Sequence, residues 1–153
     1  MVSLVVGCLR RETSASPATI LANLNEALVR SDGGKGFITC CCAVIQPDGR
    51  IDLANAGHLS PYFEGSEVDL PPGLPLGLQA GETYQQISPA VAAGVRMVFL
   101  SDGVVEAANA KGELFGFDRT RENSARSAQQ IAEAARAWGQ NDDITVVTVR
   151  RNG

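Results

Sequence analysis

The sequence predicts one α+β domain, in which mostly antiparallel strands lie between an early helix and a later group of helices. Three observations support this fold class: an amphipathic helix near the beginning, two strand-like runs joined by an Asp-Gly turn, and a helix followed by a final β-branched strand. The chain has 153 residues, the size of a single domain with a sizeable core. Its hydrophobic content of 44% and charged content of 20% are those of a folded globular protein. We therefore expect residues 1–153 to form a single domain.

The first predicted element is a helix over Ala18–Val29, introduced by Ser16 and Pro17. Serine is a preferred N-cap residue, and proline fits the first helical turn. Apolar residues recur at helical spacing and form one face: Ile20, Leu21, Leu24, Ala27 and Leu28. Asn23 and Asn25 also lie on this helix, and we expect their side chains to be solvated, as most polar side chains on such a helix are.

A β-hairpin follows the helix. The runs Phe37–Ile45 and Arg50–Ala56 have strand composition, and the segment Gln46-Pro47-Asp48-Gly49 between them has turn composition. Further strands are predicted at Leu59–Phe63 and Thr83–Ile87. Between those two, the Pro/Gly-rich segment 70–78 alternates leucines with turn residues, which favours a rigid cover packed onto the body of the domain.

Two acidic segments adjoin the last two predicted strands. The apolar run Val95–Leu100 is short and rich in β-branched and aromatic residues, which indicates a buried strand, and it stops just before Asp102. Asp142 and Asp143 open the second strand, Ile144–Arg150. Carboxylates held at the ends of strands suit hard divalent cations, which prefer oxygen ligands. The alternative is that Asp102 belongs to an ordinary Asp-Gly turn and that the later pair only separates a helix from a strand.

Helical segments connect these two strands. We expect a short helical turn at Val104–Ala107, a helix beginning near Asp118 and a final helix from about Ser127 to Trp138 that ends at Gly139. The apolar face of the final helix contains Ala128, Ile131, Ala132, Ala135 and Trp138.

Composition excludes several classes of function. The net charge of −4 and the lack of a Lys/Arg cluster give no reason to expect a nucleic-acid partner, and no run of about 18 apolar residues predicts a membrane span.

Cys40, Cys41 and Cys42 are consecutive in a strand, so they point to alternate faces and cannot converge on one metal ion. Reduced thiols in a cytoplasmic protein are the simplest interpretation. The single histidine, His58, is more readily structural than catalytic, since no Ser or Cys nucleophile motif accompanies it.

Six short motifs occur in one order along nearly the whole chain, and together they carry a family resemblance. They are Phe37-Ile38-Thr39, Asn55-Ala56-Gly57-His58, Pro72-Gly73-Leu74-Pro75-Leu76-Gly77, Ser101-Asp102-Gly103-Val104-Val105-Glu106-Ala107, Leu114-Phe115-Gly116 and Asn141-Asp142-Asp143-Ile144-Thr145. This series resembles the bacterial branch of the metal-dependent protein phosphatase 2C class, the stage II sporulation E-like serine phosphatases. The resemblance implies a layered β-sandwich flanked by helices. It also implies a serine/threonine phosphatase acting on a regulatory phosphoprotein such as an anti-sigma-factor antagonist.

The resemblance also implies a metal centre. Family enzymes hold two Mn²⁺ or Mg²⁺ ions with aspartates, and the ions activate a water that attacks phosphorus, without a covalent protein intermediate. Asp102 matches the metal-binding acid of the family's Asp-Gly motif, and Asp142 matches the ligand position of the C-terminal Asp-Asp/Asn motif. Asp143 occupies the neighbouring position, which is often Asn in relatives. No catalytic role follows for His58.

One family motif has no match here. The resemblance places two strands with an Asp-x-x-Gly-His-Gly-like motif before the first helix, and nothing of that kind lies upstream of Asp32. The chain therefore resembles the C-terminal three quarters of the family domain, without roughly 40–50 residues that a two-strand hairpin with its loops would occupy. We expect weak or no phosphatase activity from this chain alone, and self-association as a two-fold dimer that covers exposed sheet.

Two other functions are compatible with the residues. The chain could be a non-catalytic pseudophosphatase that binds a regulatory partner. It could also be a small-molecule or metal-binding α+β domain whose motifs are coincidental.

Overall fold

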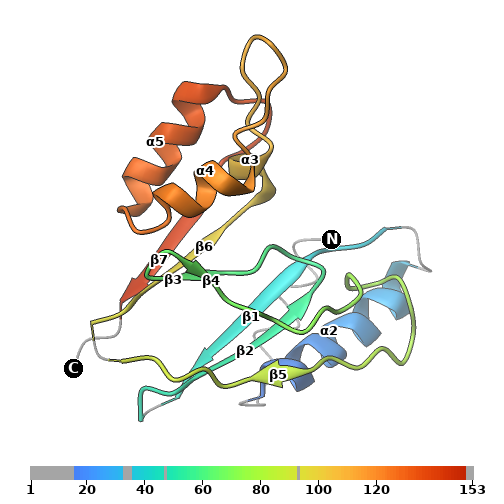
Figure 1. Ribbon diagram of the computed structural model, residues 1–153. Coiled ribbons are helices and arrows are strands. Elements are labelled where there is room, and N and C mark those ends of the chain that lie inside the picture. The colour runs from blue at the N-terminus through green and yellow to red at the C-terminus, as the bar shows by residue number, and fades with distance from the viewer. Residues whose placement is uncertain (1–15, 33–35, 47, 93, 151–153) are drawn as a thin grey trace. The chain divides into compact units, whose positions relative to one another are not determined.

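The computed structural model describes residues 16–32, 36–46, 48–92 and 94–150. The described residues form two compact units (Figure 1). The first unit contains the described residues up to His58 together with Leu70–Val91, and the second contains Leu59–Asp69 and the residues from Ala92 onward. Helices pack with antiparallel strands in each unit, so the predicted α+β class is confirmed. No helix within the described ranges is long and apolar enough to cross a bilayer.

The first unit is a helix packed on a three-stranded antiparallel sheet with strand order β1-β2-β5 (Figure 1). Its elements are α2 (Pro17–Asp32), β1 (Cys40–Ile45), β2 (Ile51–Ala56) and β5 (Gln86–Ile87). In the predicted hairpin, Cys40 lies opposite Ala56 and Ile45 opposite Ile51. Gly49 completes the turn at a φ of 80°, a value that glycine adopts without the strain a β-carbon would cause.

The apolar face predicted for the first helix forms the core of the first unit. Leu21, Leu24 and Leu28 are buried, and they cluster with Ala54 and Ala56 on one face of β2. Leucine at these spacings places one side chain per turn on the sheet, which is the expected amphipathic packing. The Ser16 hydroxyl accepts a hydrogen bond from the Thr19 N–H at 3.3 Å, as predicted for an N-cap serine.

The prediction that Asn25 is solvated is wrong, because its side chain is fully buried. The Asn25 Oδ1 accepts a hydrogen bond from the Gly77 N–H at 2.9 Å, and its Nδ2 donates to the Gln79 carbonyl at 2.8 Å. Both partners lie just beyond Leu76, which is itself buried in this core. Asn25 therefore holds the end of the Pro/Gly-rich segment onto α2, which agrees with the predicted role of that segment as a cover.

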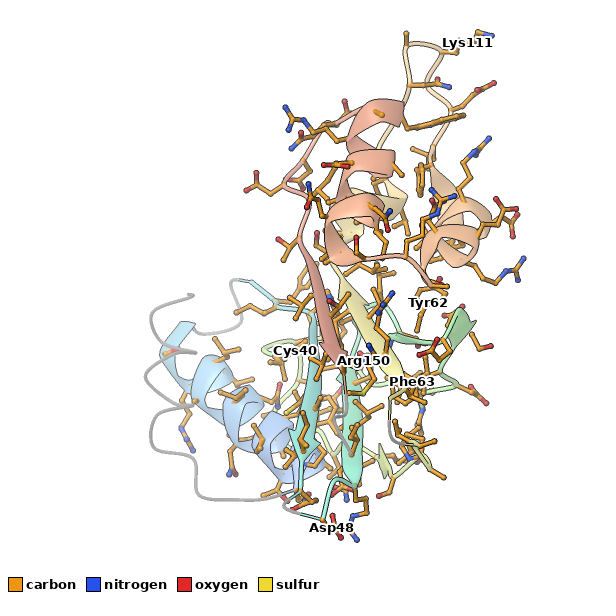
Figure 2. All side chains as sticks on the ribbon, turned by 90° about the vertical axis from the view of Figure 1, so that its left-hand side faces the viewer. Cys40, Asp48, Tyr62, Phe63, Lys111 and Arg150 are labelled. Carbon is orange, nitrogen blue, oxygen red and sulfur yellow. The ribbon has the colours of Figure 1, made fainter. Side chains whose placement is uncertain are left out.

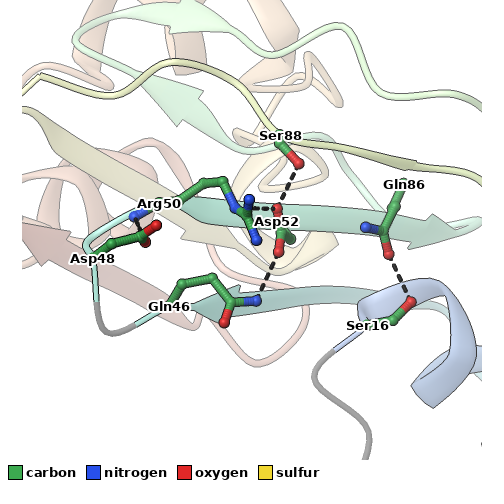
Figure 3. Close-up of polar contacts among 7 residues, drawn as sticks. All are labelled: Ser16, Gln46, Asp48, Arg50, Asp52, Gln86 and Ser88. Carbon is green, nitrogen blue, oxygen red and sulfur yellow. Dashed lines mark hydrogen bonds and ion pairs between the residues drawn. The ribbon is translucent and has the colours of Figure 1, made fainter.

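A buried carboxylate anchors the segment after β5 to the hairpin (Figure 3). The side chain of Asp52, on β2, accepts hydrogen bonds from the Ser88 hydroxyl and from Gln46 Nε2 at 2.8 Å. The Arg50 guanidinium lies 3.4 Å from the same carboxylate. The pKa of Asp52 lies below its ordinary value. The hydrogen bond from Ser88 is the largest cause, and the hydrogen bond from Gln46 is the second. A buried charge with this set of donors is satisfied, so the cluster links β2 to the segment that follows β5.

The second unit is a four-stranded antiparallel sheet with order β4-β3-β6-β7 and three helices. Its elements are β3 (Tyr62–Phe63), β4 (Ser66–Glu67), β6 (Arg96–Leu100), α3 (Asp102–Val105), α4 (Gly116–Asn123), α5 (Ala128–Trp138) and β7 (Val146–Arg150). The buried core combines Val98 and Leu100 of β6 with Val104 of α3 and Ile131 of α5. The long loop between α3 and α4 carries Lys111 at its tip (Figure 2).

The final helix begins and ends as predicted. Ser127 is its N-cap, and the Ser127 and Gln130 side chains form a reciprocal capping box. The Gly139 N–H donates to the Ala135 carbonyl at 3.1 Å at the other end. Trp138 contacts Phe115 edge-on with ring centroids 6.4 Å apart, and the Arg119 guanidinium lies 4.1 Å from the centre of the Trp138 ring.

Several predicted boundaries differ from the observed ones. The strand predicted at Leu59–Phe63 is reduced to two residues, since Pro61 has no N–H for a ladder. The strand predicted at Thr83–Ile87 is likewise reduced to its last two residues. The helix after Phe115 begins at Gly116, two residues before the predicted Asp118, and β7 begins two residues after Ile144. β4 carries no sequence signal of its own and exists because it pairs with β3.

Candidate metal centre

The second unit brings the two acidic segments to one end of a strand pair. β6 and β7 are antiparallel, with Leu100 opposite Val146. The residues that leave β6 and the residues that enter β7 therefore lie at the same end of the pair (Figure 1). The Ser101 N–H donates to the Thr145 carbonyl at 2.9 Å, which extends the pairing beyond the strands themselves.

Asp102 is the first residue of α3, with an exposed side chain. Its Oδ1 accepts a hydrogen bond from the Gly103 N–H at 3.0 Å, and its carbonyl accepts one from the Glu106 N–H at 2.9 Å. The next apolar residue, Val104, is fully buried in the core of the second unit. An exposed carboxylate on a backbone fixed by a buried neighbour can meet a cation from solvent without a large rearrangement.

Asp142 and Asp143 are both exposed and lie before β7. The Asp142 Oδ1 accepts a hydrogen bond from the Asp143 N–H at 2.7 Å, and the Asp142 carbonyl accepts one from Gln140 Nε2 at 3.3 Å. These contacts are local, so they shape the segment without fixing it to α3. Each carboxylate keeps an oxygen available for a ligand.

Two neighbours of Asp102 join these acidic segments, and sequence reasoning missed both. The Ser101 hydroxyl donates to the Asp143 carbonyl at 3.1 Å and accepts from the Thr145 N–H at 2.9 Å. Gly103 lies against the Asp143 carbonyl, so closely that a β-carbon on it would be 2.9 Å from the Asp143 carbonyl carbon. Within Ser101-Asp102-Gly103, the sequence indicated a metal-binding role for Asp102 alone and no separate role for Ser101 or Gly103. The signal in the sequence that could have pointed to these two residues is that a serine and a glycine flank the candidate acid.

The donors at this end of the sheet suit a hard cation but make only part of a full ligand set. Asp102 and Asp142 supply carboxylate oxygens, the ligand type that Mg²⁺ and Mn²⁺ prefer. Within the ranges that the structure describes, no group of three or more His, Cys, Asp or Glu side chains could hold a metal ion. A cation held by these two aspartates would therefore need water or other oxygen donors to complete its ligand set.

His58 belongs to the first unit, where it closes the β1–β2 hairpin. Its Nδ1 lies 3.0 Å from the Thr39 Oγ1. The Asn55 side chain accepts from the His58 N–H at 2.9 Å and donates to the His58 carbonyl at 2.8 Å. These contacts give the Asn55–His58 segment a structural role, as expected from its position after the second hairpin strand.

Cys40, Cys41 and Cys42, the cysteines that the structure describes, are half-buried in β1. Cys40 and Cys42 pack against the core of the first unit, and Cys41 lies between them on the other face of β1. Burial raises the pKa of Cys41 to about 12 and also raises that of Cys40. Thiols that stay protonated at neutral pH are poor nucleophiles and poor metal ligands.

Comparison with known proteins identifies the family. The profile described as stage II sporulation protein E (SpoIIE) matches residues 1–152. The chain belongs to the SpoIIE family. The phosphoserine phosphatase RsbU of Bacillus subtilis (strain 168) is 29% identical over 157 residues, an alignment that covers 92% of this chain and 47% of RsbU.

Solved structures of related domains share the fold. The RsbU and RsbW domains of Rv1364c from Mycobacterium tuberculosis superpose with a TM-score of 0.72 at 21% identity, covering 97% of this chain and 46% of that one. The manganese-presoaked phosphatase domain of SpoIIE from Bacillus subtilis superposes with a TM-score of 0.58 at 20% identity. That match covers 99% of this chain and 72% of the SpoIIE chain. The PPM Ser-Thr phosphatase MsPP of Mycobacterium smegmatis superposes with a TM-score of 0.69 at 15% identity. That match covers 99% of this chain and 81% of the MsPP chain.

These comparisons confirm the predicted family and the protein phosphatase 2C type of fold. The relatives include a phosphoserine phosphatase, RsbU, and a PPM Ser-Thr phosphatase, MsPP, and phosphatases of the 2C type depend on metal ions. The SpoIIE-family chain described here spans 47% of the length of RsbU and 46% of the solved chain that contains the RsbU and RsbW domains of Rv1364c.

Proposed function

We propose that this SpoIIE-family chain is a metal-dependent protein serine/threonine phosphatase domain. Its substrate class would be phosphoserine or phosphothreonine on a regulatory protein such as an anti-sigma-factor antagonist. The observation that carries the proposal is the antiparallel β6–β7 pair, at one end of which the Asp102 and Asp142 segments emerge together. The similarity to the phosphoserine phosphatase RsbU supports the reaction class and the phosphoprotein substrate.

Asp102 and Asp142 would hold one Mn²⁺ or Mg²⁺ ion, and the complete family site would contain two such ions. When bound, the metal supplies an activated water and offsets negative charge on the phosphoryl oxygens. The chain would position the two carboxylates: β6 and α3 carry that of Asp102, and the segment before β7 carries that of Asp142. Hydrolysis of a phosphoester depends largely on such positioning and charge stabilisation. Because two aspartates are a partial ligand set, we expect slow turnover.

Location and assembly are part of the same proposal. We expect a cytoplasmic location, as the interpretation of Cys40, Cys41 and Cys42 as reduced thiols implies. A two-fold dimer is the expected assembly, since β1 and β7 lie at sheet edges in the strand orders of the described residues.

A non-catalytic partner-binding module is the second candidate. The observation that favours it is that the described residues provide no group of three or more metal-binding side chains. Such a module would retain the fold and bind a regulator without hydrolysing it.

Hydrolysis of a phosphoserine peptide with Mn²⁺ distinguishes the two functions. We expect slow, EDTA-sensitive release of phosphate that is lost in Asp102→Asn and in Asp142→Asn. The control is Asp69→Asn, which neutralises another exposed aspartate and should leave turnover unchanged. Equal turnover in Asp102→Asn would contradict the phosphatase assignment for these residues, and absence of Mn²⁺-dependent turnover would favour the partner-binding module.

A further inference from the structure

We propose that Ser101 is the positioning residue that fixes the Asp142–Asp143 segment relative to Asp102. The inference rests on the proposed function, since it concerns how that metal site is held together. Ser101 does not need to touch the metal or the substrate. It acts through a single hydroxyl that bridges the start of α3 and the segment before β7.

The hydroxyl makes two hydrogen bonds in opposite senses to one short stretch of backbone. It donates to the Asp143 carbonyl at 3.1 Å and accepts from the Thr145 N–H at 2.9 Å. These partners flank Ile144, so one side chain fixes both ends of a three-residue segment. A group that is both donor and acceptor is required, and serine and threonine are the small residues that provide one.

The position of Ser101 in its own helix indicates that the hydroxyl is committed to this bridge. Ser101 is the N-cap of α3, with φ −80° and ψ 161°. An N-cap serine normally accepts a hydrogen bond from the first turn of its helix, as Ser127 does at α5. Ser101 makes no such capping bond. Its hydroxyl is turned instead to the neighbouring chain segment, at a cost to the local helix.

Few other contacts fix the second acidic segment to α3. The hydrogen bonds of Asp142 run to its neighbours Gln140 and Asp143. The backbone hydrogen bond from the Ser101 N–H to the Thr145 carbonyl would survive a change of side chain. Removing the hydroxyl therefore leaves the strands paired but frees the Asp143 carbonyl and the Thr145 N–H. A shift of the Asp142 carboxylate relative to that of Asp102 would follow.

The consequence is a specific loss of metal affinity. Changes to groups that orient metal ligands typically cost about 10- to 100-fold in metal affinity. We therefore expect Ser101→Ala to weaken Mn²⁺ binding by about 10- to 100-fold. Ser101→Thr keeps the donor and acceptor and should restore binding to within about threefold of the unchanged chain, a margin set by the usual context dependence of such energies.

The test is calorimetric titration of the chain with Mn²⁺, with the melting temperature of each variant measured in EDTA. Four variants are compared: Ser101→Ala, Ser101→Thr, Asp102→Asn and Ser127→Ala. Ser127 is the matched control, because its hydroxyl caps α5 by accepting from the Gln130 N–H at 3.3 Å. Loss of either serine should lower the melting temperature slightly, but only Ser101→Ala should weaken Mn²⁺ binding.

The results that would overturn the inference are distinguishable from one another. Unchanged Mn²⁺ affinity in Asp102→Asn means that the proposed site itself is wrong. Loss of affinity in Asp102→Asn with full affinity in Ser101→Ala leaves the site standing and removes the role of Ser101. Equal loss in Ser101→Ala and Ser127→Ala, or no recovery in Ser101→Thr, reduces Ser101 to a general contributor to stability. If Ser101→Ala does not fold, the comparison of Ser101→Thr with the unchanged chain decides: affinity more than tenfold weaker overturns the proposal, and equal affinity supports it.

Discussion

Gly103 is the residue at which a single added carbon should damage the candidate metal centre most directly. A β-carbon there would lie 2.9 Å from the Asp143 carbonyl carbon and 3.4 Å from the Ile144 nitrogen, with the Asp143 carbonyl oxygen nearer still. These neighbours are backbone atoms and cannot rotate away. Ordinary van der Waals contact begins at 3.4 Å, so the Asp143 carbonyl group must move by at least the difference of 0.5 Å.

The free-energy cost of Gly103→Ala follows from two opposing effects. Overpacking a tight site costs about 1–3 kcal/mol, whereas alanine in a helical position gains about 0.5–1 kcal/mol over glycine. The net loss in the free energy of unfolding is then roughly 1–2 kcal/mol. For a chain of this size, that corresponds to a fall in melting temperature of about 2–8 °C. The displaced Asp143 carbonyl is also the Ser101 acceptor, so Mn²⁺ affinity should fall by about 10- to 100-fold.

The assay pairs thermal unfolding in EDTA with calorimetric Mn²⁺ titration, and Gly112→Ala is the control. Gly112 has a φ of 79° and open space around its Cβ position, so alanine there costs about 1–2 kcal/mol of backbone strain without touching Asp143. We expect both variants to lose similar stability but only Gly103→Ala to lose metal affinity. Normal Mn²⁺ binding by Gly103→Ala would refute the idea that close approach at this residue sets the metal site.

Three further predictions concern stability. The hydrogen bond from Ser88 holds the pKa of Asp52 below 3.8, so the folded carboxylate contributes stability that is lost as the pH falls below that value. Ser88→Ala should lower stability at pH 7 and flatten the acid limb of a circular-dichroism pH titration; an unchanged limb would contradict this. Burial raises the pKa of Tyr84 to about 12, so stability should fall as the pH rises above 10, and ultraviolet titration should find one tyrosine ionising near 12. Ser127→Ala should lower stability by about 1 kcal/mol in urea unfolding through loss of the α5 cap, and a neutral effect would contradict the capping-box assignment.

The elements that could be predicted from sequence are those whose determinants are local. The β1–β2 hairpin is specified by its Asp-Gly turn, and Gly49 adopts the left-handed φ of 80° that such a turn needs. The final helix is specified by the Ser127 cap and an apolar face of which Ile131 and Ala135 are buried. In both cases the signal and its structural consequence lie within a few residues of each other.

The features that could not be predicted depend on partners that are distant in sequence. Asn25 looked like a solvated helical residue, and its burial depends on Gly77, which lies 52 positions later. Ser101 looked like part of a turn, yet its hydroxyl bonds to Asp143 and Thr145, which lie 42 and 44 positions away. A single sequence gives no register between β6 and β7, so no spacing rule could have paired these atoms. The shared position of the Asp102 and Asp142 segments was inferred from strand ends and family resemblance, and their common cation remains a prediction.

The most direct test of the central proposal is anomalous diffraction from crystals of this chain soaked in Mn²⁺. The proposal predicts one anomalous peak within about 2.0–2.4 Å of a carboxylate oxygen of both Asp102 and Asp142, the usual range for such hard cations. The peak should disappear in crystals of Asp102→Asn. Carboxylates more than about 8 Å apart, or a manganese peak bound to other residues, would contradict the account.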